Sequence, residues 1–532
     1  MRKTISRVLL VTLIVLAMFS SAMLACTSIP VGKLASADGS VFTTHTDDCG
    51  YCDPNLYYIP AADHAPGSMR PVLTGETFRS VGDGRFALPT VAGEIPQVAH
   101  TYAYFKGSYG IMNEHQVSLG ETTTSGRREL RNPAALFTII ELSYIALERA
   151  TTAREAIQIM GALAEEYGYN DGGECLTVAD PNEVWQFEIL GSTPLENSAV
   201  WVAQRIPDNQ VGVSANRVRV GEININDRAN FMASPNVYSL GEEMGWWTPG
   251  TPFLFYQVYG PSSNPYNWRR EWRVFSLLAP SLNLDPYADR YPFTIVPDEK
   301  VTLNKLASIM RDHYEGTEFD LTKGLAAGPF GTPDRWATSG TLGAWERAIS
   351  IFRAAYAWTT QARSWLPNAI GGVIWFAPDT GATSVFMPVY CANLESPETL
   401  LVSNTTIFDP KGAWWVCDFI GNFANLKYSY MIEDVKVKQA QYETKFYAMQ
   451  PAVEMAALEM YKQDPMLARK FLTTYSNQTA NNTMADYWEF AKWLIVKYND
   501  GYNNVPNVGT SLGYPEDWLR AVGFGPVALT RP

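Results

Sequence analysis

Paired runs of apolar residues, each pair separated by a short polar link, mark the first half of the chain and predict antiparallel β-hairpins. The links contain Asp, Asn, Gly or Pro, which favour turns because they tolerate or enforce the backbone angles that a turn needs. Four hairpins are expected from this pattern: 27–31 with 41–46, 110–112 with 116–121, 174–179 with 184–190, and 200–205 with 211–215.

Apolar residues at helical spacing alternate with these hairpins. The stretch 133–150 carries a stripe that includes Leu136, Ile140 and Leu147, and Thr151 or Thr152 is placed to cap a second helix that ends near residue 167. Strand pairs together with amphipathic helices indicate packed layers of sheet and helix, which is an α+β fold.

The second half of the chain gives weaker signals. The stretch 236–297 is rich in Pro, Trp and Tyr, and is expected to be an irregular insertion over a surface or pocket. Strands are expected to pair around the turn at 378–381, and a helix is expected at 302–314. A helical C-terminal region near 433–500 is predicted to hold long helices at 435–461 and 484–498.

The first 25 residues have the organisation of a secretory signal peptide. Arg2, Lys3 and Arg7 precede a 12-residue run at 8–19 that is apolar apart from Thr12, and mostly small or weakly polar residues follow at 20–25. The run is shorter than the roughly 20 residues of a membrane-spanning helix, so an uncleaved anchor is the less favoured alternative. We therefore expect an exported protein that is periplasmic, bound at the cell surface or secreted.

Composition and charge narrow the classes of function. Hydrophobic residues make up 46% of the chain and charged residues 18%, which is a globular profile. The formal net charge is −13, and loss of the three basic leader residues takes it to −16. Because an acidic chain is repelled by nucleic acid, no nucleic-acid partner is expected. The sequence leaves open whether the chain forms a homo-oligomer.

Two of the six cysteines, Cys49 and Cys52, have the C-x-x-C spacing of redox and zinc sites. The sequence contains no second C-x-x-C and no H-x-x-x-H pair, and it has only 5 His. A structural disulfide or two plain thiols are therefore expected here, and no metal site is predicted anywhere in the chain.

Cys26 follows the leader directly, and cleavage before it would place a thiol and a free α-amine on one residue. An α-amine with a pKa of about 7.7–8.0 can accept a proton at neutral pH, and a thiol with a pKa of about 8.5 needs little help to ionise. Such an amine can serve as the base for its own side chain and later protonate a leaving amine. If the first hairpin turns near residues 36–37, residues 46–48 lie across from Cys26, and Asp47 or Asp48 can orient this amine.

The segment CTSIPVGK at 26–33, the following 35–40 and Asp47-Asp48 resemble the mature start of peptidase family C69, the dipeptidase A-like cysteine N-terminal-nucleophile hydrolases related to secernins. Similar segments recur through most of the chain after residue 25, most specifically at 201–217. The resemblance implies a four-layer αββα sandwich with added C-terminal helices, formed by residues 26–532 as one catalytic domain. It also implies hydrolysis of dipeptides or related amides through a thioester, without a cofactor.

The same resemblance assigns roles to individual residues. Cys26 would be nucleophile and base, Asp47 the acid that orients the amine, and Asn216 an oxyanion-hole residue whose amide N–H stabilises the developing charge. His45 occupies the place where relatives commonly carry an arginine that grips substrate, so the substrate preference is an open question. Glu121 is a candidate for the substrate amine and Arg217 for the substrate carboxylate, with ordinary structural roles as the alternatives.

Two further readings compete with a dipeptidase. The same chemistry suits an acylase that cleaves N-acyl amides. A leader followed by small residues and Cys is also how bacterial lipoproteins begin, and a lipidated Cys26 would tether a non-catalytic binding protein to a membrane. A small peptide is the expected partner, and membrane attachment is expected only if Cys26 is lipidated.

Overall fold

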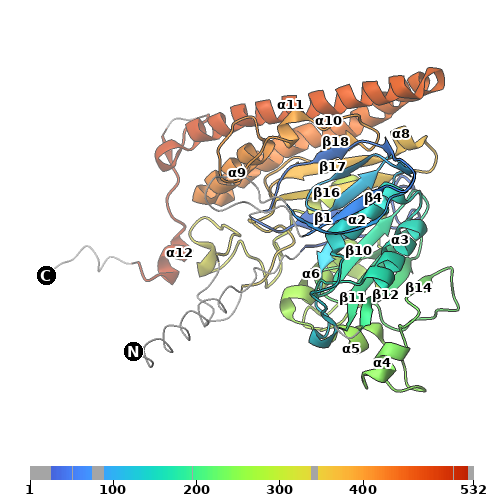
Figure 1. Ribbon diagram of the computed structural model, residues 1–532. Helices are drawn as coiled ribbons and strands as arrows, with labels where there is room; N and C mark the ends of the chain where they lie inside the picture. Colours follow the sequence, from blue (N-terminus) through green and yellow to red (C-terminus); the bar gives the residue numbers. More distant parts are fainter. Residues whose placement is uncertain are drawn as a thin grey trace, which may run out of the picture.

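Two antiparallel sheets lie face to face in the computed structural model, which describes residues 26–50, 52–74, 89–193, 196–336, 345–506 and 509–524 (Figure 1). Hydroxyl groups join the facing surfaces: Thr43 contacts Thr177, and Thr360 Oγ1 donates to Ser118 Oγ at 3.0 Å. The predicted leader at 1–25 lies outside the described residues, so its role stays a prediction.

The smaller sheet holds the strand that follows the Cys26 segment. That strand, β1, is buried along its whole length because it lies between layers, and its sequence VFTTHTD is rich in β-branched residues that suit such a position. It pairs with β16, with Asp47 opposite Tyr356. The strand order is β1 (Val41–Asp47), β16 (Tyr356–Ala362), β17 (Val373–Pro378) and β18 (Met387–Tyr390).

The larger sheet is built mainly from strands that are neighbours in the sequence. Three of the four predicted hairpins are confirmed, two of them in this sheet, where Met112 lies opposite Ser118 and Val178 opposite Trp185. The strand order is β14 (Phe231–Ala233), β12 (Glu196–Ile206), β11 (Val184–Thr193), β10 (Glu174–Ala179), β9 (Ser118–Thr123), β8 (Gly110–Asn113), β7 (Tyr104–Lys106) and β2 (Tyr57–Ile59).

Helices cover the outer face of each sheet, which completes a helix, sheet, sheet, helix order of layers (Figure 1). Helices α2 (Ile139–Arg149) and α3 (Ala153–Tyr167) pack on the larger sheet, and Thr152 caps α3 as predicted by accepting from the N–H of Glu155. The smaller sheet is covered by α9 (Ala413–Ala424), α10 (Tyr428–Gln463) and α11 (Pro465–Lys497). The α+β prediction is confirmed.

The fourth predicted hairpin is wrong. Strand β12 pairs with β11 and β14, while the next segment leaves the sheet as β13 (Val211–Gly212) and pairs with β15 (Thr294–Ile295) and with the Cys26 segment. The turn residues at 207–210 do reverse the chain, but the better partners of 211–214 are distant in the sequence. This pairing brings Asn216 close to the Cys26 segment.

The stretch 236–297 is not irregular throughout. It contains α4 (Ser239–Glu243), α5 (Phe255–Tyr259) and the longer α6 (Pro265–Leu278), which begins with a proline in its first turn and is buried on most sides. Helix α11 also begins well before the predicted residue 484, because Asp464 caps it by accepting from the N–H of Met466.

Several smaller features complete the chain. Cys49 and Cys52 form a disulfide, in agreement with the structural prediction, whereas the four other cysteines are free and buried. Within the described ranges, no helix is both long and apolar enough to cross a bilayer. The remaining elements are α7 (Leu303–Ile309), α8 (Asn368–Gly371), α12 (Glu516–Ala521), β3 (Ala62–Asp63), β4 (Met69–Leu73), β5 (Val91–Pro96), β6 (His100–Thr101), β19 (Tyr502–Asn503) and β20 (Thr510–Ser511).

Candidate active site

The Cys26 segment is held between two antiparallel neighbours. On one side the N–H of Thr46 donates to the carbonyl of Thr27 at 3.2 Å. Continuing this register places Asp47 opposite Cys26, within the range 46–48 that the position of the turn predicts. On the other side the N–H of Ser28 donates to Ser214 O at 3.0 Å, and the return bond measures 2.8 Å. Continuing this second register places Asn216 opposite Cys26.

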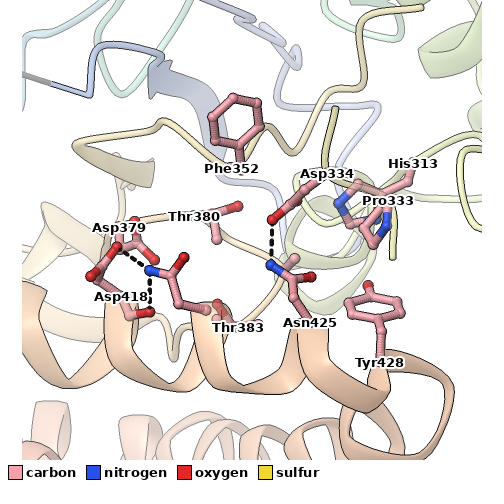
Figure 2. A pocket seen from close by; sticks show the side chains of 13 residues that line it. His313, Pro333, Asp334, Phe352, Asp379, Thr380, Thr383, Asp418, Asn425 and Tyr428 are labelled. Carbon is pink, nitrogen blue, oxygen red and sulfur yellow. Dashed lines mark hydrogen bonds between the residues drawn. The ribbon is translucent and has the colours of Figure 1, made fainter. Parts of the chain in front are cut away.

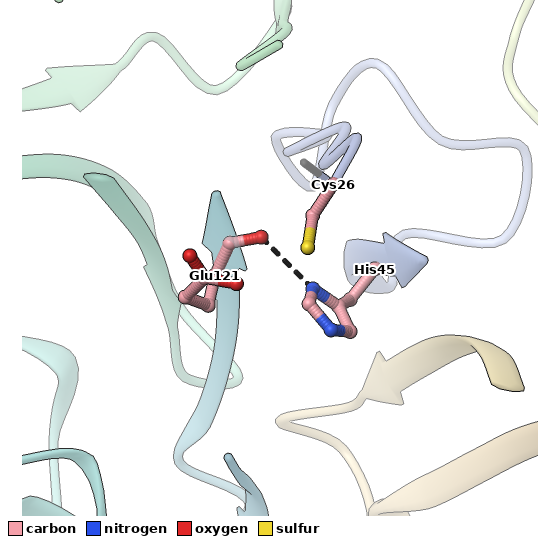
Figure 3. Close-up of side chains that lie close together, drawn as sticks. All are labelled: Cys26, His45 and Glu121. Atoms are coloured by element: carbon pink, nitrogen blue, oxygen red, sulfur yellow. Dashed lines mark hydrogen bonds between the residues drawn. The ribbon is translucent and has the colours of Figure 1, made fainter. Parts of the chain in front are cut away.

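The Cys26 side chain is fully buried in a polar group. Its Sγ, a ring nitrogen of His45 and a carboxyl oxygen of Glu121 all lie within 4.8 Å of one another (Figure 3). Burial raises the pKa of the Cys26 thiol well above its ordinary value, and the charges of Glu121, Asp48 and Asp47 raise it further, while the N–H of Asp48 opposes the shift. A thiolate here therefore needs a cation close to the sulfur.

Asp47 is a buried carboxyl with few partners. It accepts a hydrogen bond from Ser108 Oγ at 2.8 Å, and the neighbouring Ser108 N–H donates to Tyr356 Oη at 2.9 Å. Burial raises the pKa of Asp47 to about 7, with the charges of Glu121 and Asp48 acting in the same direction. A positively charged partner would therefore stabilise the ionised form of this carboxyl.

His45 cannot replace an arginine. Its Nδ1 lies 2.8 Å from Glu121 O, which fixes Nδ1 as the donor, and its Nε2 is buried with no hydrogen-bond partner. Burial lowers the pKa of His45 to about 4, so the ring is neutral at physiological pH. The ring packs edge-on to Tyr109 at 5.8 Å between centroids and lies 5.4 Å from Trp358.

The side chain of Asn216 is fixed by neighbours on both sides. The residue adopts a left-handed backbone with φ of 66°, a conformation that asparagine tolerates better than most residues. Its Nδ2 donates to Thr123 O at 2.7 Å, and its Oδ1 accepts from Arg270 at 2.7 Å. The amide plane is therefore held with little freedom.

Arg270 of α6 links the candidate nucleophile to Asn216, and the sequence analysis did not find it. Its guanidinium donates to Cys26 O at 2.7 Å, Thr27 Oγ1 at 2.9 Å, Ala215 O at 3.2 Å and Asn216 Oδ1. Burial and the nearby Arg347 lower the pKa of Arg270 to about 10, so it still carries its charge at neutral pH. One cation thus fixes both strands that flank the thiol.

A second set of missed residues surrounds Asp48. Arg347 pairs with the Asp48 carboxylate and with Tyr266 Oη, and Arg353 donates to Asp48 O. Arg347 is almost completely buried, at 1% exposure, and the Cys26 thiolate form is one of the charges that raise the pKa of Arg347. The acids beside the thiol are thus partly balanced by arginines from α6 and from 347–353.

Arg217 and Glu121 are both buried, but only Glu121 lies beside the thiol. Each guanidinium nitrogen of Arg217 has a protein acceptor, among Glu271, Ser263 and Asp289 O, so the surface salt bridge considered as its alternative is a buried one. Four of the five N–H groups of Arg217 already have protein acceptors, which disfavours Arg217 as a substrate anchor. Burial raises the pKa of Glu121, whose Oε2 has no hydrogen-bond partner.

Cys26, His45 and Glu121 also form a group of ligand atoms close enough to hold a metal ion. Sulfur, imidazole nitrogen and carboxylate oxygen are donors that suit zinc. His45 Nδ1, however, donates to Glu121 O (Figure 3), and a donating N–H cannot ligate a metal, so only Nε2 of this ring is left as a ligand atom. The group fits acid–base chemistry better than a resident metal.

A buried thiol with an acid on one side and a cation-held amide on the other is the equipment of a cysteine hydrolase. The family model of Peptidase family C69 matches residues 25–441, and the chain belongs to this family. Membership makes it a peptide-bond hydrolase, in agreement with the resemblance carried by the opening motif.

Named relatives support this assignment. The chain is 27% identical over 383 residues to a probable dipeptidase of Salmonella dublin, covering 69% of this chain and 81% of that protein. It is 26% identical over 459 residues to a probable dipeptidase of Latilactobacillus sakei, covering 81% and 89%. Dipeptidase A of Lactobacillus helveticus is 24% identical over 422 residues, covering 76% and 82%.

Proposed function

We propose that this protein is an exported cysteine dipeptidase whose mature chain begins at Cys26. The observation that carries the proposal is the pairing of Cys26 with Asp47 on one side and Asn216 on the other. A free α-amine at Cys26 supplies the cation that the buried thiol lacks. The helix, sheet, sheet, helix order of layers fits the N-terminal-nucleophile hydrolase type of sandwich.

In this mechanism the α-amine of Cys26 takes the thiol proton as the sulfur attacks the substrate carbonyl. The tetrahedral intermediate collapses by breaking the C–N bond, and the ammonium returns the proton to the leaving amine. A thioester remains on Sγ. The amine then deprotonates a water molecule, which attacks the thioester and releases the acid with the free thiol.

The neighbouring groups have distinct parts in these steps. Asp47 is an anion when it holds the α-ammonium, since the opposite charge reverses the upward shift of its pKa. The Nδ2 of Asn216 carries two N–H groups and Thr123 O uses one, which leaves the second for the oxyanion. Arg270 is a positioning residue that keeps Cys26 and Asn216 in register.

Dipeptides are the proposed substrates because the relatives are named dipeptidases. A dipeptide presents an amine and a carboxylate at a fixed separation, and charged groups of both signs surround the thiol. Glu121 lies beside the thiol and would accept the substrate amine. The positive charges near the thiol are Arg347 and Arg353, which both bind Asp48. Because His45 is neutral, it adds no positive charge beside the Cys26 thiol.

The experiment compares wild type with Cys26→Ser and Cys26→Ala on a panel of dipeptides, longer peptides and N-acyl amides. Cys391→Ser is the matched control, because Cys391 is also a free, fully buried thiol and its Sγ donates to Asn368 O. The proposal expects dipeptide hydrolysis to fall at least about 10³-fold in Cys26→Ala and to be retained in Cys391→Ser. Full activity of Cys26→Ala would overturn it, and hydrolysis of N-acyl amides alone would replace the dipeptidase by an acylase.

A further inference from the structure

A small cavity lies at the end of β17, away from the thiol and unused by the proposed mechanism. It has a volume of about 30 Å³, which is room for a single water molecule or ion. Oxygen-bearing side chains from the turn after β17 and from helix α9 face it (Figure 2). Asp379, Thr383, Asp418 and Asn422 are among its lining residues.

Three carboxylates line this cavity. Asp334 accepts a hydrogen bond from Asn425 Nδ2, whereas Asp379 and Asp418 meet without an ion pair to a basic residue in the described part of the chain. Asp379 is 3% exposed and Asp418 is half-buried on the facing helix turn. No ion pair joins either of them to a Lys, Arg or His in the described part of the chain, although Asn422 Nδ2 donates to Asp418 Oδ1 at 2.8 Å. Burial raises the pKa of both carboxyls, and the charge of Asp418 raises the pKa of Asp379 further, so a bare pair of anions is unfavourable.

An unpartnered hydroxyl points independently to a ligand. Thr383 is 3% exposed and lines the cavity, and its Oγ1 has no hydrogen-bond partner among the residues that the structure describes. Buried hydroxyls normally find one, so this oxygen is available to something that enters the cavity. Helix α9 also carries a glycine here, and a Cβ on Gly421 would lie 3.1 Å from Thr383 Oγ1 and 3.8 Å from Asp379 Oδ2. A side chain at residue 421 would therefore fill the space.

We propose that this cavity binds a divalent cation, with Ca²⁺ preferred, through the carboxylates of Asp379 and Asp418 and the hydroxyl of Thr383. One divalent ion balances the negative charges of Asp379 and Asp418, and Asp334 lines the same cavity. The donors are all oxygens, which select hard cations such as Ca²⁺ over zinc or copper. His313 also lines the cavity, with its Nδ1 3.1 Å from Glu315 Oε1, and it is not one of the proposed ligands.

The site is coupled by backbone bonds to the candidate active site. The N–H of Asp379 donates to Ala355 O at 2.9 Å, and the N–H of Ala355 donates in turn to Asp47 O at 2.7 Å. A cation that holds Asp379 in place therefore also holds the neighbouring ends of β17, β16 and β1, and Asp47 is the last residue of β1. Its role is to stabilise this edge of the smaller sheet, and it takes no part in the reaction.

The first test uses Tb³⁺ as a luminescent substitute for Ca²⁺, because Tyr428 lines the cavity and can sensitise it. The full chain is freed of metal with EDTA and titrated with Tb³⁺ under tyrosine excitation. The proposal expects a saturable signal that Ca²⁺ displaces and that falls at least tenfold in affinity in Asp379→Asn and Asp418→Asn. Asp517→Asn, which removes an exposed carboxylate of α12, is the control and should bind as wild type does.

Thermal unfolding of the same proteins guards against variants that simply fold badly. Wild type should melt on the order of 3 °C higher in Ca²⁺ than in EDTA, since the ion binds only the folded chain. Asp379→Asn should lose this difference while melting in EDTA at or above the wild-type temperature, because it removes one of two like charges. Equal melting of wild type in Ca²⁺ and EDTA, or Tb³⁺ binding unchanged in Asp379→Asn, would show that the pair shares a proton instead and would overturn the proposal.

Discussion

Replacing Arg270 by alanine tests how the strands around the thiol are held. Besides one bond to Tyr266 O in its own helix, the guanidinium donates to two acceptors in the Cys26–Thr27 segment and two in the Ala215–Asn216 turn. Helix α6 supplies a further bond, from Asn267 Nδ2 to Asn216 O at 3.0 Å, so the variant should keep the helix packed against the turn. What it removes is the cross-link between nucleophile and oxyanion donor.

The magnitude follows from these four bonds. A hydrogen bond from a charged donor contributes about 1.5–3 kcal/mol, and a buried acceptor left unpaired costs about 1–3 kcal/mol. The loss is smaller than their sum, because the variant also relieves the burial of a cation beside Arg347. We expect the free energy of unfolding to fall by about 3–5 kcal/mol. Displacing an oxyanion donor costs about 10²–10³ in kcat, and we expect that loss in the folded variant.

The assay measures kcat on a dipeptide and, by urea unfolding, the free energy of unfolding, for Arg270→Ala and for Arg269→Ala. The control removes the neighbouring arginine, which contacts Glu346, Pro286 O and the ring of Phe319 and reaches neither strand. It should keep kcat within about threefold of wild type. A folded Arg270→Ala protein with wild-type kcat would refute the positioning role of Arg270.

Three further results are expected. Because burial raises the pKa of Asp47 to about 7, the unprocessed folded chain holds this proton more tightly than the unfolded chain, and its stability falls as pH rises from about 4 to 7. In urea titrations at several pH values, the free energy of unfolding of Asp47→Asn should fall by roughly 3–5 kcal/mol less than that of wild type over this pH range. The same dependence on pH in both proteins would contradict the assignment. His45→Gln should leave the shape of the profile of kcat/KM between pH 5 and 8 unchanged, since the His45 pKa is about 4; loss of an inflection near 6.5 would show a titrating imidazole. Gly120→Ala should lose about 1–3 kcal/mol of stability, because its Cβ would lie 2.6 Å from Thr44 O of the facing strand β1, whereas Gly172→Ala, with no described atom within 4 Å, should lose none; equal stability of the two would argue against tight packing between the sheets.

Local patterns predicted the features that depend on neighbours in the sequence. The short polar link after the Cys26 segment predicted residues 46–48 opposite Cys26, with Asp47 or Asp48 as the acid, and the bond between Thr46 and Thr27 fits Asp47. The hairpins of β8 to β11 and the cap at Thr152 follow from turn and cap chemistry in the same way. The family could be recognised because its opening motif is contiguous.

Features that depend on distant pairing could not be predicted. Arg270 contacts Cys26 from 244 positions away, and Arg347 contacts Asp48 from 299 positions away. No local periodicity reports such contacts. One signal was present: Pro265 after Asn264 is typical of a helix start, which argues against an irregular stretch here.

The most direct test of the proposal is the N-terminus of the active protein. Purified enzyme is analysed by intact mass and N-terminal sequencing, and the fraction of chains that begin at Cys26 is compared with the fraction titrated by a thiol-directed, substrate-like inhibitor. We expect the two fractions to agree and every titrated chain to begin at an unmodified Cys26. Active chains that keep Ala25, or that carry a lipid on Cys26, would contradict the mechanism.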